Sequence, residues 1–160
     1  MKILGIDPGM NNIGWSILEE TSAGQVKYLQ SGKISTTTKD SLTSRLAFIF
    51  KEISKIISSH SPDAVSIEEI FVNINPRSSM TLSFARGAIL CCIGYHNLPA
   101  LEFAPNTIKK TITGNGKADK EQVMKMLKFI IPNVSFSSPD EADAIAIGYT
   151  GIILKIKSNI

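Results

Sequence analysis

The sequence predicts an α/β fold, in which helices pack against a mixed β-sheet. Three strand-like segments follow one another near the N-terminus, and the rest of the chain alternates between helix-like and strand-like segments. This order is typical of one sheet whose first strands are joined by hairpins and whose helices cover its faces. The 160 residues suffice for one domain with a substantial core, so residues 1–160 are expected to form a single unit.

Three strands open the domain. The apolar run KILGID (2–7) stops at the turn-forming sequence Asp7–Pro8–Gly9, which predicts a buried strand. The segments IGWSILEE (13–20) and VKYLQSGKIST (26–36) are the next two expected strands. Because only the turn-like sequence TSAGQ separates them, the three strands are predicted to form an antiparallel meander.

A helix and a fourth strand follow the meander. Apolar residues recur at helical spacing between Asp40 and Ser61–Pro62, namely at Leu42, Leu46, Ile49, Phe50, Ile53, Ile56 and Ile57. The proline ends this predicted helix. The segment DAVSIEEIF (63–71) is strand-like and carries Glu68 and Glu69 after its apolar residues.

The second half of the chain is predicted to hold three helices and one strand. Asn75–Pro76 resembles a helix start, with proline at the first helical position. The helix that follows, through 80–96, is apolar nearly all round, so it is either a core helix or half of a subunit interface. The later elements are a strand at 100–104, an amphipathic helix at 118–130 and a last helix that begins at Ser138–Pro139.

Composition excludes several classes of protein. With 43% hydrophobic and 19% charged residues, the chain is typical of a soluble globular protein. Polar residues interrupt the apolar N-terminal stretch, and residues 144–154 are too short to span a membrane, so no membrane association and a cytoplasmic location are expected. Cys91 and Cys92 are adjacent and surrounded by apolar residues, which favours small core residues over a zinc site or a disulfide framework.

Positive charge gathers in one segment, although the net charge is only +3. Residues 109–128 hold six lysines against Asp119 and Glu121. This segment is a candidate surface for an anion such as nucleic acid. On charge alone, a solvated helix face is the more ordinary explanation. The sequence TGNGKADK (113–120) lacks the spacing of a phosphate-binding P-loop and is expected to be a flexible loop.

Carboxylates stand at three ends of predicted elements. Asp7 ends the first strand, where it also suits a turn, and Glu68 ends the fourth. At the last helix, Ser138, Pro139 and Glu141 fit a capping box, and Asp140 suits the positive end of the helix dipole.

Asp143 is the acid that capping does not explain. It lies on the same side of the last helix as Asp140, Ile147 and Leu154. A carboxylate directed toward an apolar face is costly unless it is paired or bound to a metal. Its partner is therefore either a lysine, in a structural ion pair, or a cation that it shares with the other acids.

One hypothesis is that Asp7, Glu68, Asp140 and Asp143 meet at one rim of the sheet. Four carboxylates placed so close together could not all stay ionised without cations between them. A set of oxygen ligands without cysteine or histidine suits Mg²⁺ or Mn²⁺ better than zinc. Two such ions would support phosphodiester hydrolysis. His60 and His96 both fall at predicted helix C-termini, so a catalytic triad or a zinc hydrolase is poorly supported.

Four sequence motifs stand out along the chain, namely LGIDPGMNNIGWSI (4–17), SIEEIF (66–71), FARG (84–87) and DEADAIAIG (140–148). Together they resemble the motifs of RuvC-type Holliday junction resolvases. They occur in the order and at the separations of that family, and the similarity extends from Lys2 to about Ile153. The resemblance implies a ribonuclease H-like fold, a five-stranded mixed sheet flanked by helices with the first strand central, and a homodimer.

The resemblance also implies an activity and its residues. The expected enzyme is a Mg²⁺-dependent crossover junction endodeoxyribonuclease that resolves four-way DNA junctions by paired symmetric nicks, leaving 5′-phosphate and 3′-hydroxyl ends. Asp7, Glu68, Asp140 and Asp143 would bind two Mg²⁺ ions per subunit, for which Mn²⁺ can substitute. Lys120 would act in catalysis. The implied DNA contacts are Phe71, Arg77, Lys109, Lys110, Lys117 and Lys120.

The resemblance further implies a branch-migration complex of RuvA-type and RuvB-type proteins as the partner. The chain departs from the family at Ser83 and Phe84, where relatives often have Gly-Gln, and in Pro76–Arg77 before the same helix. Two alternatives stay open. One is a ribonuclease of the same fold, and the other is a junction-binding module without activity whose carboxylates form structural ion pairs.

Overall fold

The computed structural model describes residues 1–21, 24–70 and 76–158, of which 76–78 and 156–158 are described by their backbone alone. Five strands form one mixed sheet in the order β3-β2-β1-β4-β5. They are β1 (Lys2–Asp7), β2 (Asn12–Glu20), β3 (Val26–Ser35), β4 (Ala64–Glu68) and β5 (Ala100–Phe103). β1, β2 and β3 pair antiparallel, whereas β1–β4 and β4–β5 are parallel. The expected meander, mixed sheet and central first strand are confirmed.

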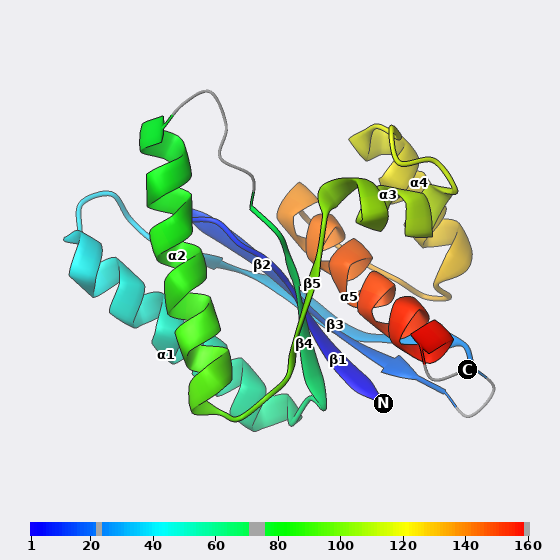
Figure 1. The fold of residues 1–160 in the computed structure, drawn as a ribbon, viewed down its shortest axis with the longest axis horizontal. Coiled ribbons are helices and arrows are strands. Elements are labelled where there is room, and N and C mark those ends of the chain that lie inside the picture. The colour runs from blue at the N-terminus through cyan, green and yellow to red at the C-terminus, as the bar shows by residue number, and fades with distance from the viewer. Residues whose placement is uncertain (22–23, 71–75, 159–160) are drawn as a thin grey trace.

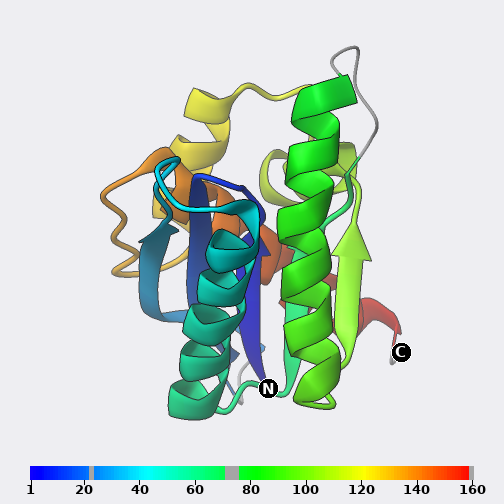
Figure 2. The same cartoon turned by 90° about the vertical axis from the view of Figure 1, so that its left-hand side faces the viewer.

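Helices cover both faces of this sheet, as the two views in Figures 1 and 2 show. On one face lie α1 (Leu42–His60) and α2 (Pro76–Tyr95), packed side by side. On the other face lie α3 (Pro105–Thr113), α4 (Lys120–Ile130) and α5 (Pro139–Ser158). Within the described ranges, no helix is long and apolar enough to cross a membrane.

The helix α3 was not predicted from the sequence. Its N-cap, Ala104, makes no side-chain hydrogen bond, so the usual polar signal of a helix start is absent. Only Ile108 and Ile112 are buried along its nine residues, which is too short an apolar pattern to identify from spacing. Tertiary packing, with these two side chains set into the core beside α5, therefore stabilises this helix.

The sheet separates two apolar clusters. Along β1, Ile3 packs on the α5 side, whereas Leu4 and Ile6 pack on the side of α1 and α2. Because side chains alternate along a strand, Gly5 and Asp7 share the α5 side with Ile3. The same alternation along β4 gives Glu68 the α5 side, since Val65 and Ile67 belong to the opposite cluster.

The backbone of α5 lies almost directly on the central strands. A Cβ atom added at Gly5 would be 2.3 Å from the carbonyl oxygen of Ala144, and one at Gly14 would be 1.9 Å from that of Asp140. The hydroxyl of Ser16 donates a buried hydrogen bond to the Ala144 carbonyl over 2.9 Å, and that of Ser66 donates one to Ile147 over 2.8 Å. These contacts fix the first turns of α5 against β1, β2 and β4.

Two smaller expectations have mixed outcomes. Cys92 is buried, as predicted, and its thiol lies 3.4 Å from the carbonyl oxygen of Phe50, but Cys91 is exposed, so the expectation was wrong for Cys91. His60 ends α1, and His96 directly follows α2 and is hydrogen-bonded to Ser54 over 2.7 Å.

Candidate active site

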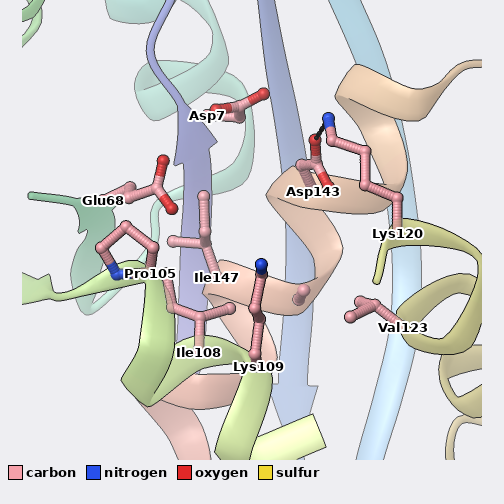
Figure 3. Close-up of a pocket in the computed structure, with 10 residues that line it drawn as sticks. Asp7, Glu68, Pro105, Ile108, Lys109, Lys120, Val123, Asp143 and Ile147 are labelled. Atoms are coloured by element: carbon pink, nitrogen blue, oxygen red, sulfur yellow. Dashed lines mark hydrogen bonds and ion pairs between the residues drawn. The ribbon is translucent and has the colours of Figure 1, made fainter. Parts of the chain in front are cut away.

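A pocket of about 240 Å³ opens at the end of β1 and β4, beside α5. Its polar lining consists of Asp7, Glu68, Lys109, Lys120 and Asp143. Its apolar lining consists of Pro105, Ile108, Val123, Ala146 and Ile147. Five separate elements thus contribute to one cavity, and Figure 3 shows the acids and lysines around it.

Asp7 and Glu68 come together because of strand register. β1 and β4 are parallel, and Ile6 is paired with Ile67. The next residue on each strand is the acid, so both carboxylates emerge at the same edge and on the α5 side of the sheet. Both carboxylates appear near the top of the pocket in Figure 3.

Asp143 joins these two acids from α5, and Lys120 joins them from the first residue of α4. The ammonium group of Lys120 lies 2.8 Å from Oδ2 of Asp143. Asp119 and Gln122 form a capping box that sets the start of α4 and thereby the position of Lys120. A lysine partner, one of the two alternatives that the sequence offered for Asp143, is therefore present, and the pair lines the pocket together with the other acids.

Burial and crowded negative charge both act on the acids of this pocket. Burial first, and then the charges of Asp143, Glu68 and Asp140, raise the pKa of Asp7 to about 8 against the opposing effect of Lys120. Burial and then Asp143 raise the pKa of Glu68, whereas Lys120 and Lys109 lower it. The pocket therefore holds more carboxylates than its two lysines neutralise, and it favours protons or added cations.

Lys120 responds to the same charges. Its hydrogen bond to Asp143 raises the pKa of the ammonium group, while burial lowers it and the charges of Asp143, Asp7 and Asp140 raise it. The lysine side chain is nevertheless 72% exposed, against 30% for Asp143. The cation is held by one carboxylate at the rim and is otherwise open to solvent.

Asp140 lies one helical turn before Asp143 and outside the lining of the pocket. Its charge still contributes to the shifts of Asp7 and Lys120, so it is close enough to belong to the same acidic group. All four acids named from the sequence are thus electrostatically linked, with Asp7, Glu68 and Asp143 in the pocket and Asp140 beside it.

The donor set fits a hard divalent cation. Within the part of the chain that the structure describes, no three histidine, cysteine, aspartate or glutamate side chains are close enough to form a ready-made metal cluster. Asp7, Glu68 and Asp143 nevertheless line one pocket, and carboxylate oxygens are the ligands that Mg²⁺ and Mn²⁺ prefer. Burial first and then the neighbouring carboxylates raise the pKa of Asp7, so a cation there would relieve the repulsion among the acids.

The expected DNA-contacting residues are distributed unevenly. Lys109 and Lys120 line the pocket, whereas Lys110 and Lys117 are exposed outside it. Phe71 lies outside the described residues. Arg77 is in the first turn of α2, but its side chain also lies outside them.

Two residues with evident roles at this site were not recognised from the sequence. Glu141, expected only as a cap, is buried and accepts hydrogen bonds from Ser137 over 2.5 Å, Ser31 over 2.8 Å and Ser138 over 3.3 Å. Burial opposes ionisation, but these hydrogen bonds lower the pKa of Glu141 overall. Its contact with Ser31 attaches the start of α5 to β3. Arg86, quoted only as part of FARG, contacts the main chain of Glu68.

The sequence is similar to those of known proteins over nearly the whole chain. The family model described as Crossover junction endodeoxyribonuclease RuvC matches residues 3–151. The protein of that name from Rickettsia massiliae is 47% identical over 156 residues, which cover 97% of this chain and 99% of the relative. The Rickettsia conorii protein of the same name is also 47% identical, with the same coverage.

Solved structures show the same fold. T. thermophilus RuvC in complex with a Holliday junction substrate superposes with a TM-score of 0.90 at 24% identity, covering 99% of this chain and 97% of that one. The yeast mitochondrial Holliday junction resolvase Ydc2 gives 0.72 at 16% identity, covering 98% of this chain and 80% of that one. With a family model that matches nearly the whole chain and relatives close to half identical, this chain belongs to the RuvC family of crossover junction endodeoxyribonucleases.

Proposed function

We propose that this protein is a divalent-metal-dependent endonuclease that resolves Holliday junctions during DNA recombination and repair. Membership of the RuvC family supports the substrate and the reaction. The observation that carries the proposal in this chain is the meeting of Asp7, Glu68 and Asp143 in one pocket with Lys109 and Lys120. A carboxylate-rich pocket rimmed by lysines suits cleavage of a phosphodiester. The carboxylates can bind metal cations, and the lysines can neutralise negative charge on the phosphate.

The proposed ligands are Asp7, Glu68, Asp140 and Asp143, which would hold two Mg²⁺ ions per subunit, with Mn²⁺ as a substitute. When bound, such ions lower the pKa of a water nucleophile and neutralise charge on the leaving oxygen. Asp7 is the most crowded of these acids, because its pKa is raised by burial and by the other three. It is therefore the carboxylate that gains most from cations, and we assign it the central position.

The lysines have a separate task at the pocket. Lys109 comes from α3 and Lys120 from α4, so the two ammonium groups reach the pocket from different helices. We assign them to the phosphate oxygens of the DNA strand, with Lys120 near the scissile phosphate as charge develops. Cleavage would leave a 5′-phosphate and a 3′-hydroxyl.

Two of the remaining proposed DNA contacts lie outside the lining of the pocket. Lys110 and Lys117 are exposed on the same basic segment and can reach phosphates of a junction arm. Phe71 and Arg77 are proposed from the family resemblance alone. Shape and phosphate contacts would supply most of the affinity, so binding would weaken steeply with salt.

A homodimer is part of the proposal, because two sites related by a two-fold axis match the symmetry of a four-way junction. α2 supports it. This helix buries Ala85, Ile89 and Ile93 against its own subunit, yet it exposes Met80 (56%), Phe84 (41%) and Tyr95 (71%). A core helix and half of a subunit interface, the two alternatives for this segment, are therefore compatible. One side of α2 lies in the core, and the other is available to a second copy. Branch-migration proteins of the RuvA and RuvB type are the proposed further partners.

One experiment tests the function directly. The purified protein is offered a synthetic four-way junction, a linear duplex and an RNA/DNA hybrid, each with Mg²⁺, Mn²⁺ or EDTA. The expected result is paired nicking of the junction alone, and only with metal. Equal cutting of all three substrates would contradict the proposal. Binding of the junction without cleavage in either metal would instead favour a non-catalytic module in which Lys120–Asp143 is a structural ion pair.

A further inference from the structure

Arg86 on α2 makes a contact that links this helix to the proposed metal site. Its Nε–H group donates a hydrogen bond of 3.2 Å to the main-chain oxygen of Glu68. Its terminal NH2 group is paired with the carboxylate of Glu102 on β5. The arginine side chain is only 16% exposed, so the guanidinium group is held at two points in a largely enclosed position.

The geometry of the sheet shows what Arg86 can influence. Leu101 and Phe103 pack with the α5 cluster, so Glu102, between them on β5, lies on the α2 side of the sheet. Arg86 also comes from that side. The carboxylate of Glu68 points the other way, into the pocket beside α5. Arg86 therefore acts on Glu68 from behind, through the peptide group, and not as a charge partner of the carboxylate.

The contacted peptide lies where β4 leaves the sheet. The pairing of β4 with β1 ends at Ile6 and Ile67, one residue before Glu68. On its other side, the ladder with β5 continues through Glu68–Phe103, and the amide of Glu69 donates to the carbonyl oxygen of Phe103 over 2.9 Å. Arg86 adds a side-chain hydrogen bond at the point where support from β1 has ended.

We propose that Arg86 is a positioning residue for Glu68, which fixes the direction of this carboxylate toward the metal site and makes it depend on the placement of α2. The inference rests on the proposed function, because it assumes that Glu68 is a metal ligand. It goes beyond it by naming a residue outside the pocket. Since α2 also presents the surface proposed for dimerisation, the contact joins that surface to one active-site acid.

The test uses Arg86→Lys in the full chain. Lysine keeps the charge but cannot reproduce the two-point fork of the guanidinium group. Mn²⁺ binding to the protein without DNA is measured by calorimetry, and single-turnover junction cleavage is measured at several Mg²⁺ concentrations. The expected result is Mn²⁺ affinity about tenfold weaker, as for other residues that orient metal ligands, and half-maximal cleavage at correspondingly higher Mg²⁺. Junction affinity measured in EDTA should remain unchanged.

A double-mutant cycle separates positioning from general damage. If Arg86 acts through Glu68, adding Arg86→Lys to Glu68→Gln weakens Mn²⁺ binding no further. An equal loss in both backgrounds would overturn the inference, and so would wild-type Mn²⁺ affinity in the single variant. A further outcome is that the wild-type protein cleaves junctions, with activity lost in Glu68→Gln but Mn²⁺ affinity unaffected in Arg86→Lys. That set of results would refute the role of Arg86 and leave the proposed function intact.

Glu102→Gln is the companion variant if Arg86→Lys lowers the melting temperature. Glu102 is 45% exposed and touches Arg86 from β5, so its replacement loosens the arginine with little cost to the core. The expected result is a smaller loss of Mn²⁺ affinity in the same direction. Unchanged Mn²⁺ affinity in Glu102→Gln, with a destabilised Arg86→Lys, would assign Arg86 to stability alone and reject the proposal.

Discussion

Lys120 and Asp143 form an ion pair of 2.8 Å in the pocket that also holds Asp7 and Glu68. One oxygen of a proposed metal ligand is thus occupied by an ammonium group. The pair joins the start of α4 to the first turns of α5, and it neutralises part of the charge that Asp143 imposes on Asp7. A divalent cation at Asp143 would compete with Lys120 for the same carboxylate.

Lys120→Met should therefore have opposite effects on metal binding and on catalysis. Without the competing ammonium group, the acids bind Mn²⁺ more tightly in the absence of DNA, by several-fold because Lys120 is largely exposed. Cleavage should fall by about a hundredfold, because a cation near the developing charge is lost. Calorimetry with Mn²⁺ and single-turnover cleavage of a four-way junction measure the two effects.

Lys109→Met is the matched control for this prediction. Lys109 lines the same pocket, but its charge acts on Glu68, and it has no ion pair with Asp143. Its removal should change Mn²⁺ affinity less than that of Lys120. An equal gain in both variants would mean that overall charge, and not competition for Asp143, decides the affinity. In an Asp143→Asn background, Lys120→Met should give no gain.

Asp7→Asn should abolish cleavage and leave junction binding largely intact. The variant keeps the shape of the side chain but removes the charge of the most crowded acid, so the proposed central ligand is lost. Binding in EDTA at neutral pH should be nearly unchanged, because Asp7 with a pKa of about 8 is mostly uncharged without metal. Gel-shift titration and cleavage assays measure the two properties, and a variant that cuts at the wild-type rate would remove Asp7 from the metal site.

The raised pKa of Asp7 also predicts how the metal-free protein responds to pH. Because the folded-state pKa of about 8 exceeds the ordinary value of 3.8, the protonated acid favours the folded state. This contribution is complete below about pH 4 and is lost as the pH rises toward 8. In EDTA, the melting temperature of Asp7→Asn relative to that of the wild type should therefore increase from pH 5 to pH 8.5. A difference that is constant with pH would contradict the raised pKa.

Much of this architecture could be predicted from local patterns, because periodicity identifies which side of a segment is buried. Strand alternation and helical spacing gave the sheet and every helix except α3, whose stability comes from packing and not from its own signals. The acids were recognisable because each stands at the end of an element, where local structure only partly explains it.

What the sequence could not provide was which distant side-chain and main-chain groups meet in the folded chain. Ser31 and Glu141 are separated by 110 positions, and nothing in either segment indicates that a serine of β3 holds the start of α5. The bond from Arg86 to the Glu68 carbonyl is equally invisible, because main-chain groups have no sequence signal. The prediction that Cys91 is buried was also wrong, because α2 exposes part of its apolar surface.

The close approach of α5 to β1 gives the last prediction, which concerns Gly5. A methyl group at this position would lie 2.3 Å from the Ala144 carbonyl oxygen and 2.7 Å from the amide nitrogen of Gly148, both main-chain atoms that cannot rotate away. In Gly5→Ala, α5 must shift or tilt away from the sheet. The expected cost is about 2–3 kcal/mol of the free energy of unfolding.

The same shift should impair catalysis beyond the loss of stability, because Asp140 and Asp143 move with α5 while Asp7 stays on β1. Urea unfolding measures the first effect, and cleavage at a temperature where the variant is fully folded measures the second. Gly94→Ala is the control, since a methyl group there meets no atom within 4 Å. Full activity in folded Gly5→Ala would show that the acids tolerate displacement, and the tight packing of α5 would then serve stability alone.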